Sequence, residues 1–115
     1  MRFLMQIFQG EALEAWSRLS EEDQKGVAAG YAALNETPGV TPGEWLAQPD
    51  AATTVRVQDG AAVTTDGPFA ETKEALGGYF LFEGDDLAAA IAVAATVPAT
   101  RFGGAVEIRP LVQYS

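Results

Sequence analysis

The stretch Arg2 to Phe8, RFLMQIF, decides the fold because it predicts a strand that is apolar on both faces. Side chains of a strand alternate between its two sides. One side carries Phe3, Met5 and Ile7, and the other carries Leu4, Gln6 and Phe8. A strand with two largely apolar sides needs cover above and below it, as a strand inside a layered fold does.

A second stretch, Gly78 to Glu83, GYFLFE, has the same two-sided character and predicts another strand of the sheet. Tyr79 and Phe80 are neighbours in it and therefore point to opposite sides. We expect one of them to face the helices and the other to face a second copy of the chain. The glycine pair Gly77-Gly78 at its start favours a bend or a bulge.

The first clear helix is predicted to begin after Ser20 and to end near Asn35. Ser20 opens the tetrapeptide SEED, which has the form of a capping box, and its three acids suit the helix dipole. Helical spacing predicts a core side of Val27, Tyr31 and Leu34.

The second helix is predicted to follow the acidic cap Gly84-Asp85-Asp86. Pro98 stops it, because proline cannot continue a helix. Its apolar residues recur at i, i+3, i+4 and i+7, which predicts a core stripe of Leu87, Ala90, Ile91 and Ala94.

The middle of the chain predicts a hairpin preceded by an irregular segment. Residues 52–57 and 61–65 are rich in valine and threonine, and Asp59-Gly60 between them is the strongest short-range hairpin signal. Thr37 to Pro49 is rich in proline and predicts a loop or an irregular edge strand. We expect Trp45 and Leu46 to anchor that segment.

The last strand is AVEIRPLV, in which Val106 and Ile108 share one side and Glu107 and Arg109 form a pair on the other. The resulting order predicts one α+β domain over residues 1–115, of ferredoxin-like character, with an antiparallel sheet and helices on one face. Two helices cover only one face of such a sheet. Because the strands are apolar on both faces, we expect a second copy to cover the other, which makes a homodimer.

Composition narrows the possible chemistry. The net charge is −9, with 16 acidic and 7 basic side chains, which argues against nucleic acid or an anionic membrane as a partner. The chain has no cysteine and no histidine, so thiolate nucleophiles, Ser-His triads and most zinc sites are excluded. No signal peptide or membrane span is recognisable, which predicts a cytoplasmic protein.

The loop DGPFAETKE, from Asp66 to Glu74, permits two interpretations. In the structural one, Asp66, Gly67 and Pro68 form a turn and Phe69 plugs it into the core. In the functional one, the turn holds carboxylates at the mouth of a pocket. Asp66 is then the first candidate for general base, with Tyr79 as a possible donor.

The candidate binding residues for a small anionic organic ligand are Arg56, Glu71 and Lys73. Lys73 can neutralise an anionic group, and Arg56 can present a fork to a carboxylate. The alternatives are a solvated turn for Glu71 and Lys73 and an ion pair of Arg56 with Asp66 or a similar acid across the hairpin. No metal-binding or cofactor-binding pattern is present, so no metal and no cofactor are expected.

The run TTDGPFAETKEALGGYFLFEGDDLAAAI, together with TTVRVQDG upstream and GGAVEIRPL downstream, resembles the DGPF-type branch of the YCII-related family. RFLMQIFQGE also resembles the family's opening strand. The resemblance implies a dimeric α/β-barrel arrangement and a function that is largely unassigned. Some members resemble enzymes with a histidine–aspartate pair, which a chain without histidine cannot reproduce. The branch also occurs beside or fused to alternative sigma factors.

Three functional hypotheses follow. The first is a homodimer that binds a small organic molecule between sheet and helices and, if it is an enzyme, performs cofactor-independent acid/base chemistry of the isomerase or lyase type. The second is a non-enzymatic regulator that binds a sigma factor through its acidic surface. The third is a dimeric structural module in which the loop serves assembly alone.

Overall fold

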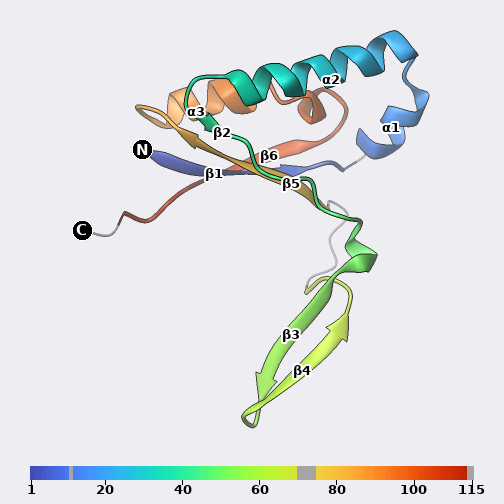
Figure 1. The fold of residues 1–115 in the computed structure, drawn as a ribbon, viewed down its shortest axis with the longest axis vertical. Coiled ribbons are helices and arrows are strands. Elements are labelled where there is room, and N and C mark those ends of the chain that lie inside the picture. The colour runs from blue at the N-terminus through green and yellow to red at the C-terminus, as the bar shows by residue number, and fades with distance from the viewer. Residues whose placement is uncertain (11, 70–74, 114–115) are drawn as a thin grey trace.

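The computed structural model describes residues 1–10, 12–69 and 75–113 (Figure 1). The strands are β1 (Arg2–Phe8), β2 (Val40–Thr41), β3 (Thr53–Gln58), β4 (Ala61–Asp66), β5 (Leu76–Glu83) and β6 (Ala105–Pro110). The helices are α1 (Ala12–Arg18), α2 (Glu21–Glu36) and α3 (Leu87–Ala94), with the short 3₁₀ helices η1 (Pro49–Ala51) and η2 (Pro98–Arg101). The chain is an α+β protein, as its sequence predicts.

The central element is a four-stranded sheet with the order β2-β5-β1-β6, in which every paired neighbour is antiparallel. This order is compatible with a ferredoxin-like fold, and β3 and β4 form a separate two-stranded sheet. The predicted sheet and the predicted hairpin are thus both present. The sequence did not indicate that the hairpin stands apart from the sheet.

Strand register explains which side chains share a face. Phe3 lies opposite Phe82, Met5 opposite both Phe80 and Ile108, and Ile7 opposite Val106. The burial of β1 alternates strictly from Arg2 to Phe8, with Phe3, Met5 and Ile7 at 0–3% exposure. The predicted division of RFLMQIF into two sides is therefore confirmed, and the helices cover the side of Phe3, Met5 and Ile7.

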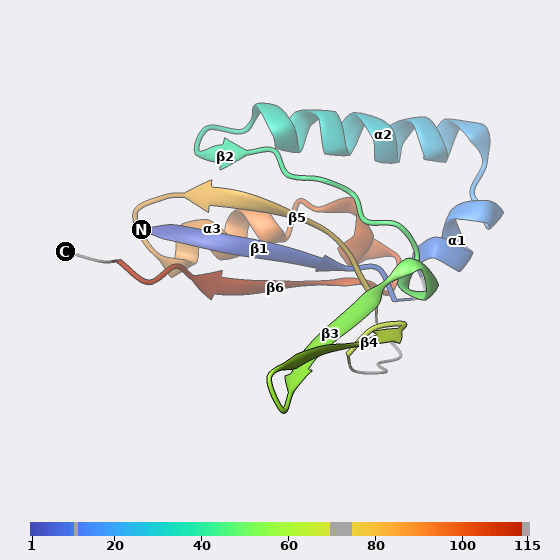
Figure 2. The same cartoon turned by 60° about the horizontal axis from the view of Figure 1, so that its bottom comes forward.

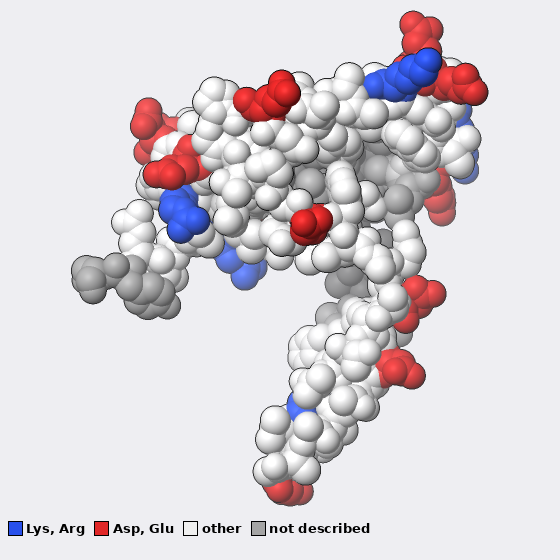
Figure 3. All heavy atoms as spheres, viewed as in Figure 1, with Lys and Arg blue, Asp and Glu red and all other residues white. Residues whose placement is uncertain are grey.

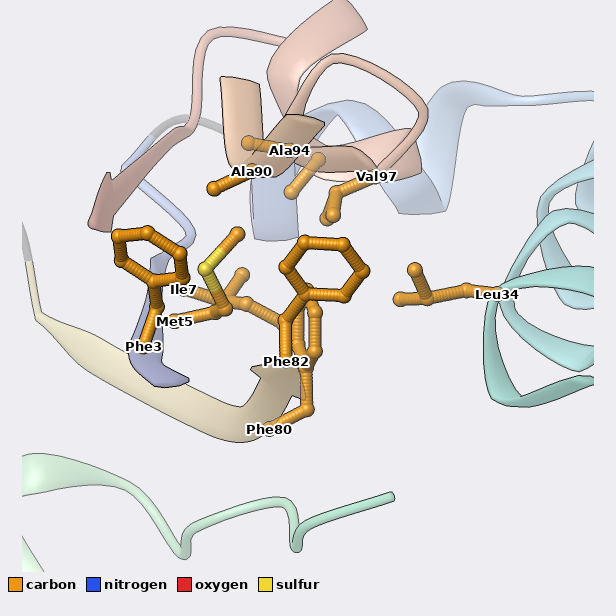
Figure 4. Close-up of a cluster of buried hydrophobic side chains, with 10 residues drawn as sticks. Phe3, Met5, Ile7, Leu34, Phe80, Phe82, Ala90, Ala94 and Val97 are labelled. Atoms are coloured by element: carbon orange, nitrogen blue, oxygen red, sulfur yellow. The ribbon is translucent and has the colours of Figure 1, made fainter. Parts of the chain in front are cut away.

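The hydrophobic core lies between this face and the helices. Figure 4 shows Phe3, Met5, Ile7, Phe80 and Phe82 pointing from β1 and β5 toward Ala90, Ala94, Val97 and Leu34. The rings of Phe3 and Phe82 are stacked, with centroids 6.4 Å apart. Three bulky phenylalanines face α3, and the α3 residues buried against them are the small Ala90 and Ala94.

The core side of α3 differs from the predicted stripe. Ala90 and Ala94 are buried, whereas Leu87 and Ile91 are 51% and 53% exposed. Because α3 is apolar all round, its periodicity does not identify the face that packs. Alanines let α3 approach the phenylalanine layer closely, so the two larger residues turn outward.

Helix α2 begins and ends where the sequence predicts. The side chain of Ser20 accepts a hydrogen bond from the Asp23 amide at 3.1 Å, and Val27 and Leu34 are buried. Gly30 lies close to η2, since a Cβ atom there would come within 2.9 Å of the Pro98 ring. At the other glycine of this helix, Gly26, a Cβ atom would meet open space.

The proline-rich segment forms the edge of the sheet, as expected. After β2, the Tyr79 amide donates to the Glu44 carbonyl, and the Leu46 amide donates to the Gly77 carbonyl at 2.8 Å. Trp45 forms an isolated bridge with Gly78. Its backbone is thus anchored, although its side chain stays 52% exposed.

The hairpin of β3 and β4, called the arm below, extends away from the sheet. Asp59 and Gly60 form its tip with positive φ angles of 52° and 79°, which is the geometry of a type I′ turn. Every residue of β4 is exposed, and Val55 and Val57 of β3 are 60% and 71% exposed. Figures 1 and 2 show α2 and α3 on one side of the four-stranded sheet and the arm descending on the other.

The face of the four-stranded sheet opposite the helices, called the open face below, carries the second set of strand side chains. By register it holds Leu4, Gln6 and Phe8 of β1 and Tyr79 and Leu81 of β5. Tyr79 is 38% exposed, while Phe80 is buried against the helices. The prediction that these neighbours divide between the two faces is therefore confirmed.

Candidate functional site

The DGPF turn lies at the base of the arm. Asp66 ends β4 opposite Thr53, and Gly67 follows with a φ of 99°, which glycine adopts without strain. The Gly67 amide donates to the Ala52 carbonyl, and the Thr54 hydroxyl donates to the Gly67 carbonyl, both at 2.7 Å. These two bonds close the arm, and the Asp66 side chain stays exposed.

Phe69 and Arg56 lie differently from the prediction. Phe69 is 74% exposed and does not plug into the core. The Arg56 guanidinium lies 4.9 Å from the centre of its ring, a cation–π geometry. Arg56 pairs with Val63, so it lies on the opposite face of the arm from Asp66, and the predicted ion pair between them is not formed. Side chains alternate between the two faces of a strand. Arg56 is three residues from Thr53, the partner of Asp66, so Arg56 and Asp66 point to opposite faces.

The two candidates for proton transfer do not share a sheet. Tyr79 is in the four-stranded sheet and Asp66 is in the arm. Glu71 and Lys73 lie outside the described residues. The predicted pair on β6 is confirmed, because Arg109 donates to Glu107 at 2.7 Å.

A large hollow, called the arm-base hollow below, lies where the arm meets the sheet. Its volume is about 840 Å³, and Pro68 of the DGPF turn borders it. Phe8 and Leu76 extend it onto the open face, and Leu46 and Gln48 line it from the edge segment. Its walls are mainly apolar, which is usual for a site that binds a small organic molecule.

A second hollow, called the aromatic hollow below, lies on the helix side of the molecule. Its volume is about 590 Å³, within the range of sites for small molecules. Helix α2 lines it with one stripe of residues: Val27, Ala28, Tyr31, Ala32 and Asn35. The other walls come from Gln9, Ala12, Trp16, Trp45, Ala99 and Phe102.

Tyr31 lies at the centre of that stripe. Its ring meets the ring of Trp45 edge-on, with centroids 4.9 Å apart at 87°. Burial raises the pKa of the Tyr31 hydroxyl above 10.0, although the Ala99 backbone and the Arg101 guanidinium oppose this. The hydroxyl therefore stays protonated at neutral pH and can donate a hydrogen bond.

Sequence reasoning identified only part of this arrangement. It considered Trp16, Trp45 and Met5 as pocket residues but favoured the core for all three. Met5 is in the core, whereas Trp16 and Trp45 are 42% and 52% exposed and line the aromatic hollow. Tyr31 was predicted as a core residue and is only half-buried. The sequence feature that could have indicated this site is the presence of two tryptophans in short or irregular segments.

Charge is unevenly distributed over the surface. Figure 3 shows acidic side chains around the helical layer, while the arm is covered mostly by uncharged atoms. Within the described part of the chain, acidic side chains form no group of three or more that could hold a metal ion. Among the same residues, no helix is both long enough and apolar enough to span a membrane.

Comparison with known proteins gives a family but no activity. The family model of the YCII-related domain matches residues 1–115. An uncharacterized protein of Rhizobium meliloti (strain 1021) is 36% identical over 104 residues, which cover 87% of this chain and 82% of that protein. A match over the whole length, together with the two-sided sheet strands described above, leads to one conclusion. The chain belongs to the YCII-related domain family.

Proposed function

We propose that the chain works as a homodimer that binds a small organic molecule beside the DGPF turn. The observation that carries this proposal is the arm-base hollow, because it joins three features in one place. It is bordered by Pro68 of the DGPF turn, by residues 49–52 that lead into the arm, and by Phe8 and Leu76 of the open face. A ligand held there would lie next to Pro68, which follows Asp66 by two residues in the DGPF turn.

Two features of the chain support the dimer. The helices cover one face of the sheet, and the open face presents Leu4, Phe8, Tyr79 and Leu81. The arm adds Val55 and Val57, which share one of its faces and are both strongly exposed. An isolated two-stranded hairpin is marginally stable in water, so an arm with exposed valines needs a packing partner. A second copy, seated between open face and arm, supplies cover for both.

The symmetry of such a dimer makes the contact reciprocal. In a twofold dimer the same surface meets itself, so each open face covers the other and each arm reaches the partner. The arm-base hollow lies at the corner between these two surfaces. A second copy therefore closes the hollow from its open side and excludes water from it.

If the protein is an enzyme, the proposed chemistry is cofactor-independent acid/base catalysis of the isomerase or lyase type. Asp66 is the candidate base and Tyr79 the candidate donor, with Arg56, Glu71 and Lys73 binding an anionic substrate. Because Asp66 and Tyr79 lie in different sheets, the proposal requires the partner to bring one of them to the other. Binding to a sigma factor stays the alternative prediction.

The test is ligand screening by thermal shift with small carboxylates such as benzoate, pyruvate and citrate. We expect at least one to raise the melting temperature of the wild-type protein, and Arg56→Gln to abolish the rise. Arg18→Gln is the matched control, because Arg18 is an exposed arginine on α1, away from the arm. If a carboxylate still raises the melting temperature of Arg56→Gln, Arg56 does not bind the ligand. If no carboxylate raises the melting temperature of the wild-type protein, the ligand is not an anion of this kind.

Turnover is tested separately once a ligand is found. Asp66→Asn keeps the size of the side chain but removes its ability to accept a proton as a base. We expect this variant to bind the ligand and to lose turnover. Full turnover by Asp66→Asn would rule out Asp66 as the catalytic base.

A further inference from the structure

A second binding site, independent of the arm and of the proposed function, lies in the aromatic hollow. We infer that this hollow binds an uncharged, planar aromatic molecule that carries a hydroxyl or carbonyl group. The inference rests on the composition of its walls, on their arrangement, and on the charges around them.

The walls offer several aromatic rings from separate elements. Trp16 comes from α1, Tyr31 from α2, Trp45 from the sheet edge and Phe102 from the residue after η2. Aromatic rings prefer offset-stacked or edge-to-face contacts with other rings, and each such pair adds to the gain from apolar burial. Trp16 and Trp45 are roughly half-exposed, so both have ring surface that a planar ligand can cover.

Helix α2 presents small, exposed residues to the hollow. Ala28 and Ala32 alternate with Tyr31 and Asn35 along the stripe of α2 that faces the hollow. Larger side chains at these two positions would fill the space. The alanines therefore leave room beside the aromatic walls, and a flat ring can lie against those walls.

Polar groups in the hollow are uncharged. The described lining residues include no Asp, Glu, Lys or Arg, and their polar side chains are Gln9, Tyr31 and Asn35. Two amides and a protonated hydroxyl recognise neutral hydroxyl or carbonyl groups well, since each can donate or accept a hydrogen bond. Arg101 is a nearby cation that acts on the Tyr31 hydroxyl and lies 6.0 Å from the centre of the Phe102 ring, but its side chain is exposed and does not line the hollow.

The net charge of the whole chain also disfavours an anionic ligand. With a net charge of −9, the protein repels negative ligands on average. An anion in the hollow would also lose its hydration without gaining a charged partner from the described walls. An uncharged ring avoids both costs.

The experiment uses three bicyclic probes of matched size with the wild-type protein. 2-Naphthol is planar and neutral at pH 7, 2-naphthoate is planar and anionic, and 2-decalol is neutral but not planar. Isothermal titration calorimetry measures affinity, and amide shifts in ¹H–¹⁵N NMR spectra locate the site. We expect saturable binding of 2-naphthol with shifts at Ala28, Ala32 and Asn35, and affinities about tenfold weaker for the other two probes.

Two variants connect the binding to the hollow. Ala32→Trp fills this room and should abolish binding of 2-naphthol. Ala29→Trp is the matched control, because Ala29 is an exposed alanine of the same helix and is not among the lining residues. Trp45→Ala removes one wall and should weaken binding about tenfold.

Each other outcome overturns part or all of the inference. Equal or tighter binding of 2-naphthoate would show that the hollow does not prefer an uncharged ligand. Equal binding of 2-decalol would show that the hollow does not select planar molecules. No shift at the hollow with any probe, or equal binding by Ala32→Trp, would overturn the site. None of these results affects the arm-base hollow, whose own test uses carboxylates and Arg56→Gln.

Discussion

At the scale of single residues, stability depends on a few large side chains that the helices cover completely. Phe82 is 5% exposed and stacks on Phe3. We expect Phe82→Ala to lower the free energy of unfolding by about 3–5 kcal/mol, because it removes buried area and leaves a cavity. Urea unfolding followed by circular dichroism measures the change.

The matched control for Phe82 is Phe69, the same residue type in an exposed position. Phe69→Ala loses mainly its contact with Arg56, which is worth about 0.5–1 kcal/mol at an exposed site. Equal losses for the two variants would contradict the assignment of Phe82 to the core and of Phe69 to the surface.

Tyr31 makes the stability of the folded protein depend on pH in alkaline solution. Burial holds the pKa of its hydroxyl above 10.0, so above pH 10 the folded state binds the proton more tightly than the unfolded state. This contribution to stability is complete below pH 10 and is lost as the pH rises through the folded pKa. Urea unfolding at pH 9 to 12 should show a decline that Tyr31→Phe reduces. An identical decline in Tyr31→Phe would contradict this prediction.

Single residues also show where sequence reasoning reaches its limit. The alternation in β1, the cap at Ser20 and the turn at Asp59-Gly60 depend on neighbours in the chain, so each could be predicted. Phe69 could not be placed, because its surroundings depend on where the whole arm points. Arg56 and Asp66 were predicted as a pair, but strand register places them on opposite faces of the arm.

At the scale of elements, α2 contains two glycines in different surroundings. A Cβ atom on Gly26 meets nothing within 4 Å, whereas one on Gly30 would come within 2.9 Å of the Pro98 ring. Gly26→Ala should raise the free energy of unfolding by about 1 kcal/mol, since alanine favours helix more than glycine does. Gly30→Ala should lower it, because Pro98 is buried and its ring has little freedom to move.

Chemical denaturation of both glycine variants measures these opposite signs in one experiment. The control is built into the pair, because both substitutions bring the same change in helix propensity. An equal gain in stability for both would mean that Gly30 does not determine how closely α2 approaches η2.

Elements were predicted better than their contacts. Both main helices, the edge segment and the five other predicted strands lie close to where the sequence places them. The packing face of α3 was predicted only in part, because a helix made of alanine, leucine, isoleucine and valine has no polar side to mark it. The aromatic hollow was missed for a related reason, since exposed and buried tryptophans look alike in a sequence.

At the scale of the whole molecule, the chain is an L-shaped body with principal extents of 52 × 44 × 18 Å. Helices and sheet form one limb and the arm forms the other, with the open face on the inner side (Figure 2). On the open face Tyr79 is 38% exposed while Leu4, Phe8 and Leu81 are partly buried, and on the arm Val55 and Val57 are 60% and 71% exposed. This shape is the main reason to propose a second copy.

The central claim concerns the open face, and Leu4 lies on it at the middle of β1. Leu4→Lys should dissociate the proposed dimer, because the dimer would bury this charge between two apolar faces. Leu87→Lys is the matched control, since Leu87 is an exposed leucine of α3 on the other side of the sheet. If Leu87→Lys dissociates the dimer and Leu4→Lys does not, the interface lies on the helical side of the sheet.

The most direct measurement is sedimentation equilibrium of the wild-type protein at micromolar concentration. The proposed dimer predicts twice the 12.1 kDa mass of one chain. A stable species with the mass of one chain would contradict it.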